Sequence, residues 1–533
     1  YEAIDKHVEE GHGNDIALHF INDNTTETYT YRNLMKNSNK IANVLVDDAH
    51  VKRGDRVFIF MPRSPESACA MLGIMKIGAL ACPIFEAFME RAVYERVYDC
   101  SAKVLITTID MLYRIPIDQL PDLETIYIAS DYIGKFKEPF IHSLKPLVQA
   151  ASDEFEVQFV GENDPMLLCY TSGSTGKPKG ILLSHKGVMM QAYQTGKFVL
   201  DLKPDDIYWC TADPGWVTGA VYSLLTPWLH GIQAILAGGR FKAENWYRNL
   251  QDYKVTVWYS APTALRLLMS SDPSIAKRFD ISSVRNIYSV GEPLNPEVIR
   301  WAMAEFGIRI HDTWFMTETG SQMVCNYPCM PIKPGSMGKP IPGVEVALMD
   351  NHHNLIGNNI MGTLVVKKGW PAMMSAVWGS EEKYNSYFVG ENNEWYSSGD
   401  TAYRDDDGYY WYQGRIDDVI NTSGERVGPF EVESKLLEHP AVIEAGVIGI
   451  PDPTRGQIIK AFVTLSDGYV PSDALKKELR DFVKLGLAAH AAPREFAFCD
   501  SLPKTRSGKI MRRVLKAREL GLPEGDLSSM DDD

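Results

Sequence analysis

Residues 171–180 read TSGSTGKPKG, and each of these ten residues is Gly, Ser, Thr, Pro or Lys. The segment follows the apolar run MLLCY at 166–170, which has the pattern of a buried strand. Small residues directly after a strand let backbone N–H groups turn toward an anion, and hydroxyls and lysines add further donors and charge. The stretch therefore predicts a phosphate-binding loop at the end of a strand.

The spacing within this stretch excludes two other kinds of loop. Neither Gly173 nor Gly176 begins the G-x-x-x-x-G-K-[ST] pattern of a P-loop ATPase. A hydrolase nucleophile elbow around Ser174 would need Gly at position 172, where Ser stands. Taken alone, the stretch could also be a flexible surface loop. The choice between this and a phosphate-binding loop depends on the rest of the sequence.

Strand and helix patterns alternate on both sides of the stretch along the first 300 residues. Strands are expected at 56–61, 79–84, 104–107, 125–129, 234–237 and 256–260, and helices at 31–46 and 65–77. Such alternation predicts βαβ units with largely parallel sheets, which bind ligands at the carboxyl ends of their strands.

The pattern becomes richer in strands and turns at about 320–415 and changes again past Gly414. Helices are then expected at 428–438, 473–485 and 509–520, and strands at 445–450 and 460–466. The expected fold class is α/β: a large N-terminal domain of βαβ subdomains with mixed sheets plus a β-rich subdomain, and a small α+β C-terminal domain. We place these domains at residues 1–416 and 417–533.

Composition indicates a soluble globular protein with more than one hydrophobic core. The chain has 533 residues, of which 45% are hydrophobic and 23% charged. Its formal net charge of −15 argues against a nucleic-acid partner, because most of the surface would repel a phosphate backbone. Lys76 and Pro83 interrupt the most apolar span, 69–85, so no membrane segment is expected.

The eight cysteines lack the paired spacing of zinc ligands and are expected to be reduced thiols of a cytoplasmic protein. The sequence opens at Tyr1 and not at Met, so we expect a native N-terminus, with any targeting signal, to lie upstream.

The chain resembles the adenylate-forming superfamily, which comprises acyl-CoA synthetases, luciferases and peptide-synthetase adenylation domains. Its motifs appear in family order: TSGSTGKPKG at 171–180, SVGEP at 289–293, DTWFMTETG at 312–320, SGD at 398–400, GRIDDV at 414–419, SGERVGPFEVE at 423–433 and LPKTRSGKIMRR at 502–513. The segments TADPGWVTG at 211–219 and SVGEPLNPE at 289–297 are most similar to the acetyl-CoA synthetase branch. The resemblance implies formation of acetyl-CoA from acetate, ATP and CoA, with release of AMP and pyrophosphate, through an acetyl-adenylate.

The resemblance implies an ATP site assembled from several of these motifs. The β- and γ-phosphates would be held by Thr171, Ser174, Thr175 and Lys177, within a loop that also contains Ser172, Gly173 and Gly176. The adenine would be lined by Gly291, Glu292 and Pro293, and the base and α-phosphate flanked by Asp312, Thr313, Trp314, Phe315, Met316 and Thr317. Asp400 would accept the ribose hydroxyls, Arg415 would assist it, and Arg426 would reach the phosphate. Glu318 would hold Mg²⁺, a cation that prefers oxygen ligands.

Lys509 would be the catalytic cation of the implied reaction, with Thr317 and Glu318 as the other catalytic residues. Seven lysines and arginines and no acid lie between 501 and 518 of this acidic chain. A solvated basic helix is the alternative. The resemblance instead places Lys509 between the α-phosphate and the incoming carboxylate, where a positive charge stabilises the developing negative charge. Acetylation switches related enzymes off at this lysine, so an acetyltransferase and a deacetylase are expected partners.

The resemblance also implies that the C-terminal domain is a mobile lid with its hinge at Asp417. One pose would present Lys509, and the other would turn Ser423 and Gly424 toward the pantetheine arm of CoA. Arg114 and Lys484 are candidates for the CoA phosphates, with ordinary surface positions as the alternative.

Trp216, Val217 and Thr218 match the acyl-pocket strip of acetyl-CoA synthetases, but Phe315 stands where their D-T-W-W motif has a second Trp. Phe is smaller, and each further buried CH₂ group contributes about 0.8 kcal/mol. Acetate is therefore the expected main substrate, with propionate tolerated. A synthetase for propionate or other short or branched acids, and a non-catalytic nucleotide sensor on the same fold, remain alternatives.

Overall fold

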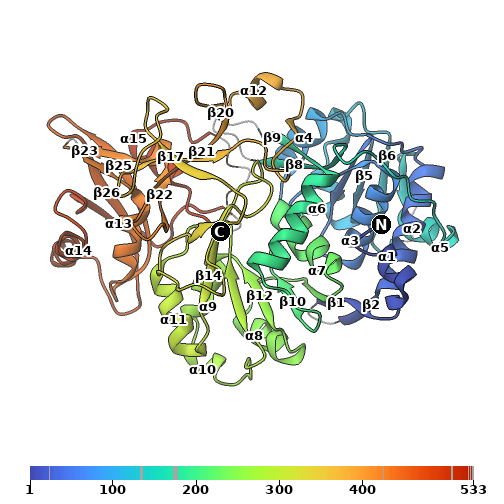
Figure 1. Cartoon of the computed structure of the whole chain (residues 1–533), viewed down its shortest axis with the longest axis horizontal. Helices are drawn as coiled ribbons and strands as arrows, with labels where there is room; N and C mark the ends of the chain where they lie inside the picture. The colour runs from blue at the N-terminus through green and yellow to red at the C-terminus, as the bar shows by residue number, and fades with distance from the viewer. Residues whose placement is uncertain are drawn as a thin grey trace.

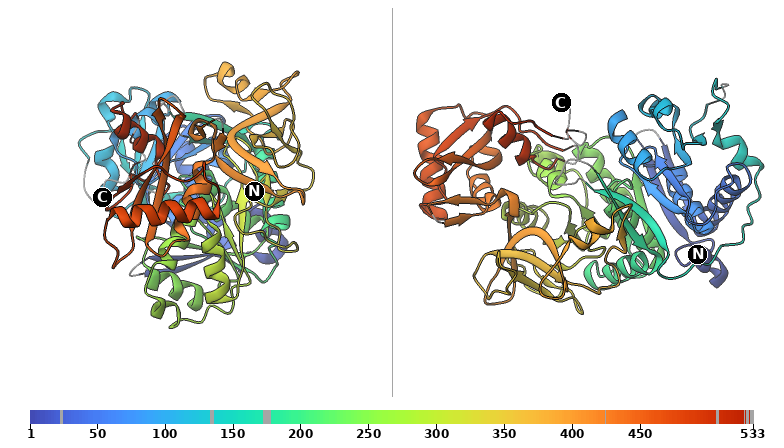
Figure 2. Two further views of the ribbon diagram at one scale, coloured as in Figure 1. Left: turned by 90° about the vertical axis from the view of Figure 1, so that its left-hand side faces the viewer. Right: turned by 90° about the horizontal axis from the view of Figure 1, so that it is seen from above.

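The structure is a computed structural model that describes residues 1–22, 25–132, 136–171, 178–423, 425–505, 508–525, 527 and 530 (Figures 1 and 2). Within these ranges the strands form four sheets. No helix in the described ranges combines the length and the apolar character that a bilayer crossing requires.

The first sheet has the strand order β16-β15-β14-β13-β12-β10-β11-β1-β2. Neighbours are parallel from β14 to β1 and antiparallel at both edges. Its strands are β1 (Ile16–Asn22), β2 (Thr25–Thr30), β10 (Ile207–Cys210), β11 (Gln233–Ala237), β12 (Val257–Ser260), β13 (Asn286–Ser289), β14 (Ile310–Trp314), β15 (Val324–Cys325) and β16 (Lys339–Pro340).

The second sheet has the order β19-β9-β8-β4-β3-β5-β6-β7 and is parallel from β8 to β7. Its strands are β3 (Arg56–Phe60), β4 (Leu80–Pro83), β5 (Val104–Thr107), β6 (Thr125–Ile128), β7 (Ile141–Ser143), β8 (Pro165–Thr171), β9 (Lys179–Ser184) and β19 (Ala376–Val377). Strand β8 therefore ends where the phosphate-binding loop is predicted to begin.

The third and fourth sheets are smaller. The third is antiparallel and consists of β17 (Val346–Met349), β18 (Gly362–Lys367), β20 (Phe388–Val389), β21 (Trp395–Arg404) and β22 (Tyr410–Arg415). The fourth consists of β23 (Ile420–Thr422), β24 (Glu425–Val427), β25 (Val442–Asp452), β26 (Gly456–Leu465) and β27 (Glu495–Phe498).

Helices connect and cover these sheets. The α-helices are α1 (Asp5–His7), α2 (Tyr31–Asp47), α3 (Pro65–Ile77), α4 (Glu90–Asp99), α5 (Leu144–Ala150), α6 (His185–Gln194), α7 (Thr226–Leu229), α8 (Ala243–Asp252), α9 (Pro262–Met269), α10 (Pro273–Ala276), α11 (Pro296–Phe306), α12 (Glu381–Asn385), α13 (Pro429–Leu437), α14 (Asp473–Gly486) and α15 (Arg512–Leu520). The 3₁₀ and π segments are η1 (Val8–His12), η2 (Ile109–Arg114), η3 (Ile117–Gln119), η4 (Thr195–Val199), η5 (Thr218–Leu225) and η6 (Ile416–Asp418).

Local sequence sets the ends of α3. The Ser64 side chain accepts a hydrogen bond from the backbone N–H of Ser67 at 3.1 Å, which satisfies one free donor of the first turn. Pro65 occupies the first helical position, and Gly78 ends the helix at a φ of +76°, in the left-handed region. The bounds expected for this helix and for the strand at 104–107 coincide with α3 and β5.

One apolar core joins the first three sheets, and the fourth sheet has a core of its own. Ile59 of β3, Tyr259 of β12 and Val366 of β18 belong to the shared core. Val447 of β25 and Leu479 of α14 belong to the separate one. Figure 1 shows this last unit, orange to red, beside the green helices α9 and α11 and far from the blue N-terminal helices. The expected fold class, a large N-terminal and a smaller C-terminal domain, is confirmed, while the boundary at 416/417 stays a prediction.

The expected helix at 509–520 is wrong at its start, because α15 begins at Arg512. Thr505 and Lys509 instead bond to each other: the Thr505 N–H donates to the Lys509 carbonyl at 2.8 Å, and the Lys509 N–H donates to Thr505 Oγ1 at 3.0 Å. Gly508, directly before the expected helix, has a φ of +90°, in the left-handed region. Lys509 therefore lies on a loop in front of the helix.

Candidate active site

A cleft of about 1780 Å³ is lined by residues of both domains. Its wall carries thirteen lysines and arginines and eleven aspartates and glutamates, whereas the whole chain has 54 basic and 69 acidic residues. The cleft thus reverses the charge balance of the molecule, which favours an anionic ligand.

Most of the described residues that the sequence singled out lie on this wall. They are Thr171, Trp216, Val217, Thr218, Gly291, Glu292, Pro293, Asp312, Thr313, Trp314, Phe315, Met316, Thr317, Glu318, Asp400, Arg415, Asp417 and Lys509. They come from loops and strand ends of three sheets together with the Lys509 loop. The structure thus brings together the predicted phosphate, adenine, ribose and acyl groups.

Glu318 lies next to the end of β8. Thr171, the last residue of that strand, donates from Oγ1 to Glu318 Oε1 at 3.3 Å. The Glu318 side chain is buried, which raises its pKa because a carboxylate loses solvation there. A cation beside Glu318 would restore the stability of its charged form. The oxygen donors of Glu318 and Thr171 suit Mg²⁺, which completes its shell with phosphate and water oxygens.

Lys179 and Lys383 also line the cleft. Lys179 is one of the lysines expected to add charge to the phosphate-binding loop, whereas Lys383 was not predicted as a site residue. Lys179 pairs with Thr171 across β8 and β9. Burial, with the nearby charge of Lys383, lowers the pKa of Lys179. The Nζ atom of Lys383 lies 4.9 Å from the ring centre of Tyr387, which shares the cleft wall. The run of small residues pointed to the loop, while Lys383 stands more than 200 residues further along the chain.

Asp400 is held from two sides on β21. Its Oδ1 accepts from Arg415 Nη1 at 2.9 Å, and its Oδ2 accepts from Trp314 Nε1 at 2.9 Å. These bonds fix the carboxylate plane and leave further lone pairs on both oxygens, because a carboxylate offers about four acceptor sites. The arrangement suits a pair of ribose hydroxyls.

Asp312 is buried on β14 at the cleft wall. Its Oδ1 has no hydrogen-bond partner among the described residues. Burial raises the pKa of this carboxyl well above its ordinary value. A buried acceptor without a donor is costly, so the atom suits an N–H group of a bound ligand.

Lys509 enters the cleft from the C-terminal domain. A side chain at position 508 would place its Cβ 2.1 Å from Thr263 Cγ2, so only Gly lets the Lys509 loop pack so closely on α9. Lys509 lines the cleft, and loss of solvation there lowers the pKa of its ammonium, while the charges of Asp400 and Glu292 oppose that shift. A cation held near two carboxylates is positioned for an anionic ligand between them.

The acyl strip has aromatic walls. The Trp216 ring centre lies 5.5 Å from that of Phe85 and 6.0 Å from that of Phe88. Phe315 packs edge-on against Tyr222 at 5.5 Å between ring centres, and Tyr222 is fully buried. The sequence motifs did not point to Tyr222, although it lies on η5, which begins at Thr218 of the acyl strip.

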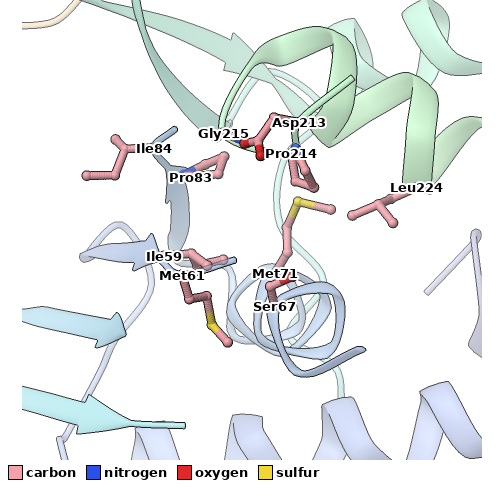
Figure 3. A pocket seen from close by; sticks show the side chains of 10 residues that line it. All are labelled: Ile59, Met61, Ser67, Met71, Pro83, Ile84, Asp213, Pro214, Gly215 and Leu224. Carbon is pink, nitrogen blue, oxygen red and sulfur yellow. The ribbon is translucent and has the colours of Figure 1, made fainter. Parts of the chain in front are cut away.

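A small cavity of about 10 Å³ lies under the acyl strip (Figure 3). Asp213 and Gly215 border it from the strip side, and Met71 and Ser67 border it from α3. Asp213 Oδ2 lies 3.7 Å from Arg63 Nε and has no hydrogen-bond partner in the described chain. Burial raises the pKa of Asp213 to about 7, against the effect of the Arg63 charge.

Some predicted residues lie away from the cleft or outside the description. Arg426 on β24 and the exposed Ser423 turn are not on its wall. Arg114 donates from Nη1 to the carbonyl of Glu86 at 3.0 Å, and Lys484 is exposed on α14. These positions do not test a second pose of the C-terminal domain. Ser172, Gly173, Ser174, Thr175, Gly176, Lys177 and Gly424 lie outside the described residues.

Comparison with known proteins shows the family. Residues 5–378 match the AMP-binding enzyme family, and residues 431–509 match the AMP-binding enzyme C-terminal domain. The chain belongs to the AMP-binding enzymes. It is 58% identical over 532 residues to the acetyl-coenzyme A synthetase of Bacillus subtilis (strain 168), covering 100% of this chain and 92% of that protein. It is 40% identical over 559 residues to the acetyl-coenzyme A synthetase of Deinococcus radiodurans, covering 100% and 85%.

Solved structures of AMP-binding enzymes share the architecture. The anthranilate CoA ligase AuaEII, in complex with anthranoyl-AMP, has a TM-score of 0.89 at 30% identity and covers 98% of both chains. An acyl-CoA synthetase of Brucella canis has a TM-score of 0.75 at 36% identity, covering 98% of this chain and 94% of that one. The family matches and the identity to the Bacillus subtilis enzyme confirm the resemblance to the acetyl-CoA synthetase branch.

Proposed function

We propose that this protein is an AMP-forming acetate–CoA ligase. Acetate displaces pyrophosphate from ATP to give acetyl-adenylate, and the CoA thiol then displaces AMP to give acetyl-CoA. The observation that carries the proposal is the entry of Lys509 into the same cleft as Glu318, Asp400 and the acyl strip. The acetyl-coenzyme A synthetases among its relatives support acetate as the acid.

The side chains of the cleft account for the first step. A carboxylate must approach the phosphorus of a polyanion, so fixed positive charge and hydrogen-bond donors are the main source of rate. Lys509 supplies charge between the two anions, and the Thr317 hydroxyl donates to an α-phosphate oxygen. Asp400 and Asp312 hold the ribose and the base so that the reacting atoms stay aligned. Mg²⁺ held by Glu318 would neutralise charge on the phosphates.

The aromatic walls restrict the acid. Trp216 is braced by Phe85 and Phe88, and Phe315 is backed by Tyr222, so the pocket stays short although Phe replaces Trp at position 315. Acetate is the proposed main substrate, with propionate as a slower one.

For the second step, we propose that the domain carrying Lys509 swings about Asp417. Asp417 lies on the exposed segment η6, between the third sheet and the fourth. The swing would take Lys509 out of the cleft and bring the Ser423–Arg426 region toward it. Acetylation of Lys509 would remove the charge needed for the first step only. A cytoplasmic location fits eight unpaired cysteines, all in the described part of the chain.

A panel of straight-chain acids from two to eight carbons tests the proposal, with acyl-adenylate and acyl-CoA measured separately. Acetate should give the highest kcat/KM for both products. A higher value for butyrate or a longer acid would contradict acetate as the substrate. Absence of any acid-dependent pyrophosphate release would identify a nucleotide sensor instead.

The Lys509→Gln variant tests the assigned roles. It should lose adenylate formation by at least a hundred-fold and still convert supplied acetyl-adenylate and CoA into acetyl-CoA. Lys477→Gln, an exposed position on α14 outside the cleft wall, is the matched control. Full adenylation by Lys509→Gln would refute the role of this lysine.

A further inference from the structure

A chain of hydrogen bonds runs from the predicted adenine loop into the C-terminal domain. Thr263 Oγ1 donates to both carboxylate oxygens of Glu292, at 2.9 and 2.8 Å, and Arg266 Nη2 donates to Glu292 Oε2 at 3.0 Å. Arg266 Nη1 also donates to Asn295 Oδ1 at 3.2 Å. Asn295 Nδ2 then donates to Ser434 Oγ at 3.0 Å, and Ser434 belongs to α13 of the C-terminal domain.

The hydrogen-bonded groups are buried, so water cannot easily replace their partners. Asn295 is 4% exposed and the Glu292 side chain 8% exposed, so neither has free access to water as a substitute partner. Both ends of the Asn295 amide are engaged, one by each domain. An ion pair also links the domains, Arg300 with Glu438 at 3.7 Å, but the Arg300 side chain is 53% exposed and the pair contributes little.

The same network touches the Lys509 loop. Thr263, which binds Glu292, is also the residue against which Gly508 packs. The adenine loop, α9 and α13 are therefore joined through one cluster of polar contacts, and Gly508 packs against this cluster at Thr263. A shift of α13 away from Asn295 would break the hydrogen bond that holds the Ser434 hydroxyl to the N-terminal domain.

We propose that Asn295 is a positioning residue that docks the C-terminal domain in the pose that presents Lys509, and that Arg266 couples this docking to the adenine loop. The inference rests on the proposed function, because it assigns the docked pose to adenylate formation. Nucleotide contact with the loop at 291–293 fixes the position of the Glu292 side chain. The Arg266–Asn295 pair, which bonds to Glu292, then holds Ser434 and α13 in place. Lys509 thus reaches the cleft preferentially when the nucleotide is present.

Ser434→Ala tests the docking, because it removes one hydroxyl of the C-terminal domain and no group from the cleft wall. Acetyl-adenylate formation should slow about five-fold, the effect of one lost hydrogen bond, with the KM for acetate unchanged. Conversion of supplied acetyl-adenylate and CoA into acetyl-CoA should keep its rate. Arg300→Ala, which breaks the exposed pair at the same interface, is the control and should change either rate less than two-fold.

A double-mutant cycle of Asn295→Ala and Ser434→Ala measures the contact itself. The double variant should be no slower in adenylate formation than Asn295→Ala alone, because the two residues share one interaction. Strictly additive effects, or equal slowing of both half-reactions by Ser434→Ala, would overturn the proposal. If Asn295→Ala does not fold, Arg266→Lys replaces it in the cycle, since it keeps a charge but loses the forked geometry.

The experiment separates this inference from the proposed function. If the unmodified enzyme forms no acetyl-adenylate, the proposed function fails and takes the inference with it. If it forms acetyl-adenylate and Ser434→Ala leaves both half-reactions unchanged, the docking role alone is wrong.

Discussion

At the scale of single residues, Phe315 has its ring edge against Tyr222, and the depth of the acyl pocket depends on this pair. Tyr222 is anchored in turn: its hydroxyl lies 3.3 Å from Thr195 Oγ1, and its ring packs edge-on at 5.9 Å from that of Tyr259. Because Tyr222 is anchored, the Phe315 ring cannot move back to admit a longer acid. The size of the side chain at position 315 therefore sets the length of acid that the pocket accepts.

Phe315→Trp should therefore narrow the choice of acid. The ratio of kcat/KM for propionate to that for acetate is expected to fall about four-fold, the value of one buried CH₂ group at about 0.8 kcal/mol. Initial rates of pyrophosphate release with each acid measure the ratio. Phe159→Trp, at a position 77% exposed, is the control, and an unchanged ratio in Phe315→Trp would show that another side chain limits the pocket.

Asp213 makes stability depend on pH in an unusual direction. Its pKa is about 7 in the folded protein, above the ordinary value of about 3.9 expected for the unfolded chain. The folded state therefore binds this proton more tightly, and the stability that the proton contributes is present below about pH 4 and is lost as the pH rises toward 7.

Asp213→Asn removes that dependence. The stability of the variant relative to the unmodified protein should improve between pH 5 and pH 7, by at most about 1.4 kcal/mol per pH unit. Urea unfolding at pH 5, 6 and 7 measures the trend. The control is Asp473→Asn, whose side chain is 96% exposed, and a pH-independent difference for Asp213→Asn would contradict the assigned pKa.

At the scale of elements, the acyl strip and η5 depend on glycines that bring two backbones together. A Cβ at Gly219 would lie 1.9 Å from the Asp213 carbonyl oxygen, and one at Gly215 would lie 2.3 Å from the Phe85 backbone nitrogen. These neighbours are backbone atoms, which cannot rotate away as a side chain can. Residues 213–219, which include the acyl strip, are thus held between the backbone at Asp213 and the residues that follow β4.

Gly219→Ala should displace this strip. We expect a loss of about 2 kcal/mol or more in stability and at least a ten-fold loss of acetate-dependent pyrophosphate release, because Trp216 and Val217 move with the turn. Calorimetry and initial rates measure the two effects. Gly357→Ala is the control, since nothing lies within 4 Å of its added Cβ, and near-normal activity of Gly219→Ala would show that the turn can relax.

At the scale of the whole molecule, a ligand that contacts both domains should stabilise them together. A stable analogue of acetyl-adenylate at one hundred times its Kd adds about 2.7 kcal/mol. For a chain of 533 residues this raises Tm by about 2–3 °C. The shift, measured by calorimetry with and without analogue, should shrink in Asp400→Asn and persist in Asp473→Asn. Equal shifts in both variants would place the ribose elsewhere.

Sequence alone determined the elements whose signals are local. The bounds of α3 follow from Ser64, Pro65 and Gly78, and the strand at 104–107 from an apolar run, because caps and periodicity act within a few residues. The motifs also identified the family. Most of the described residues to which they assign a role lie on the cleft wall. The start of α15 was not predicted correctly, because Lys509 bonds back to Thr505 and the helix begins only at Arg512.

Only the tertiary structure decided which distant groups meet. Thr171 bonds to Glu318 across 147 positions of chain, and Asn295 bonds to Ser434 across 139. No periodicity or spacing records such pairs, because they depend on how sheets and domains pack after the local elements have formed. The reversed charge of the cleft and the depth of the pocket behind Phe315 arise in the same way, from side chains that approach one another only in the folded chain.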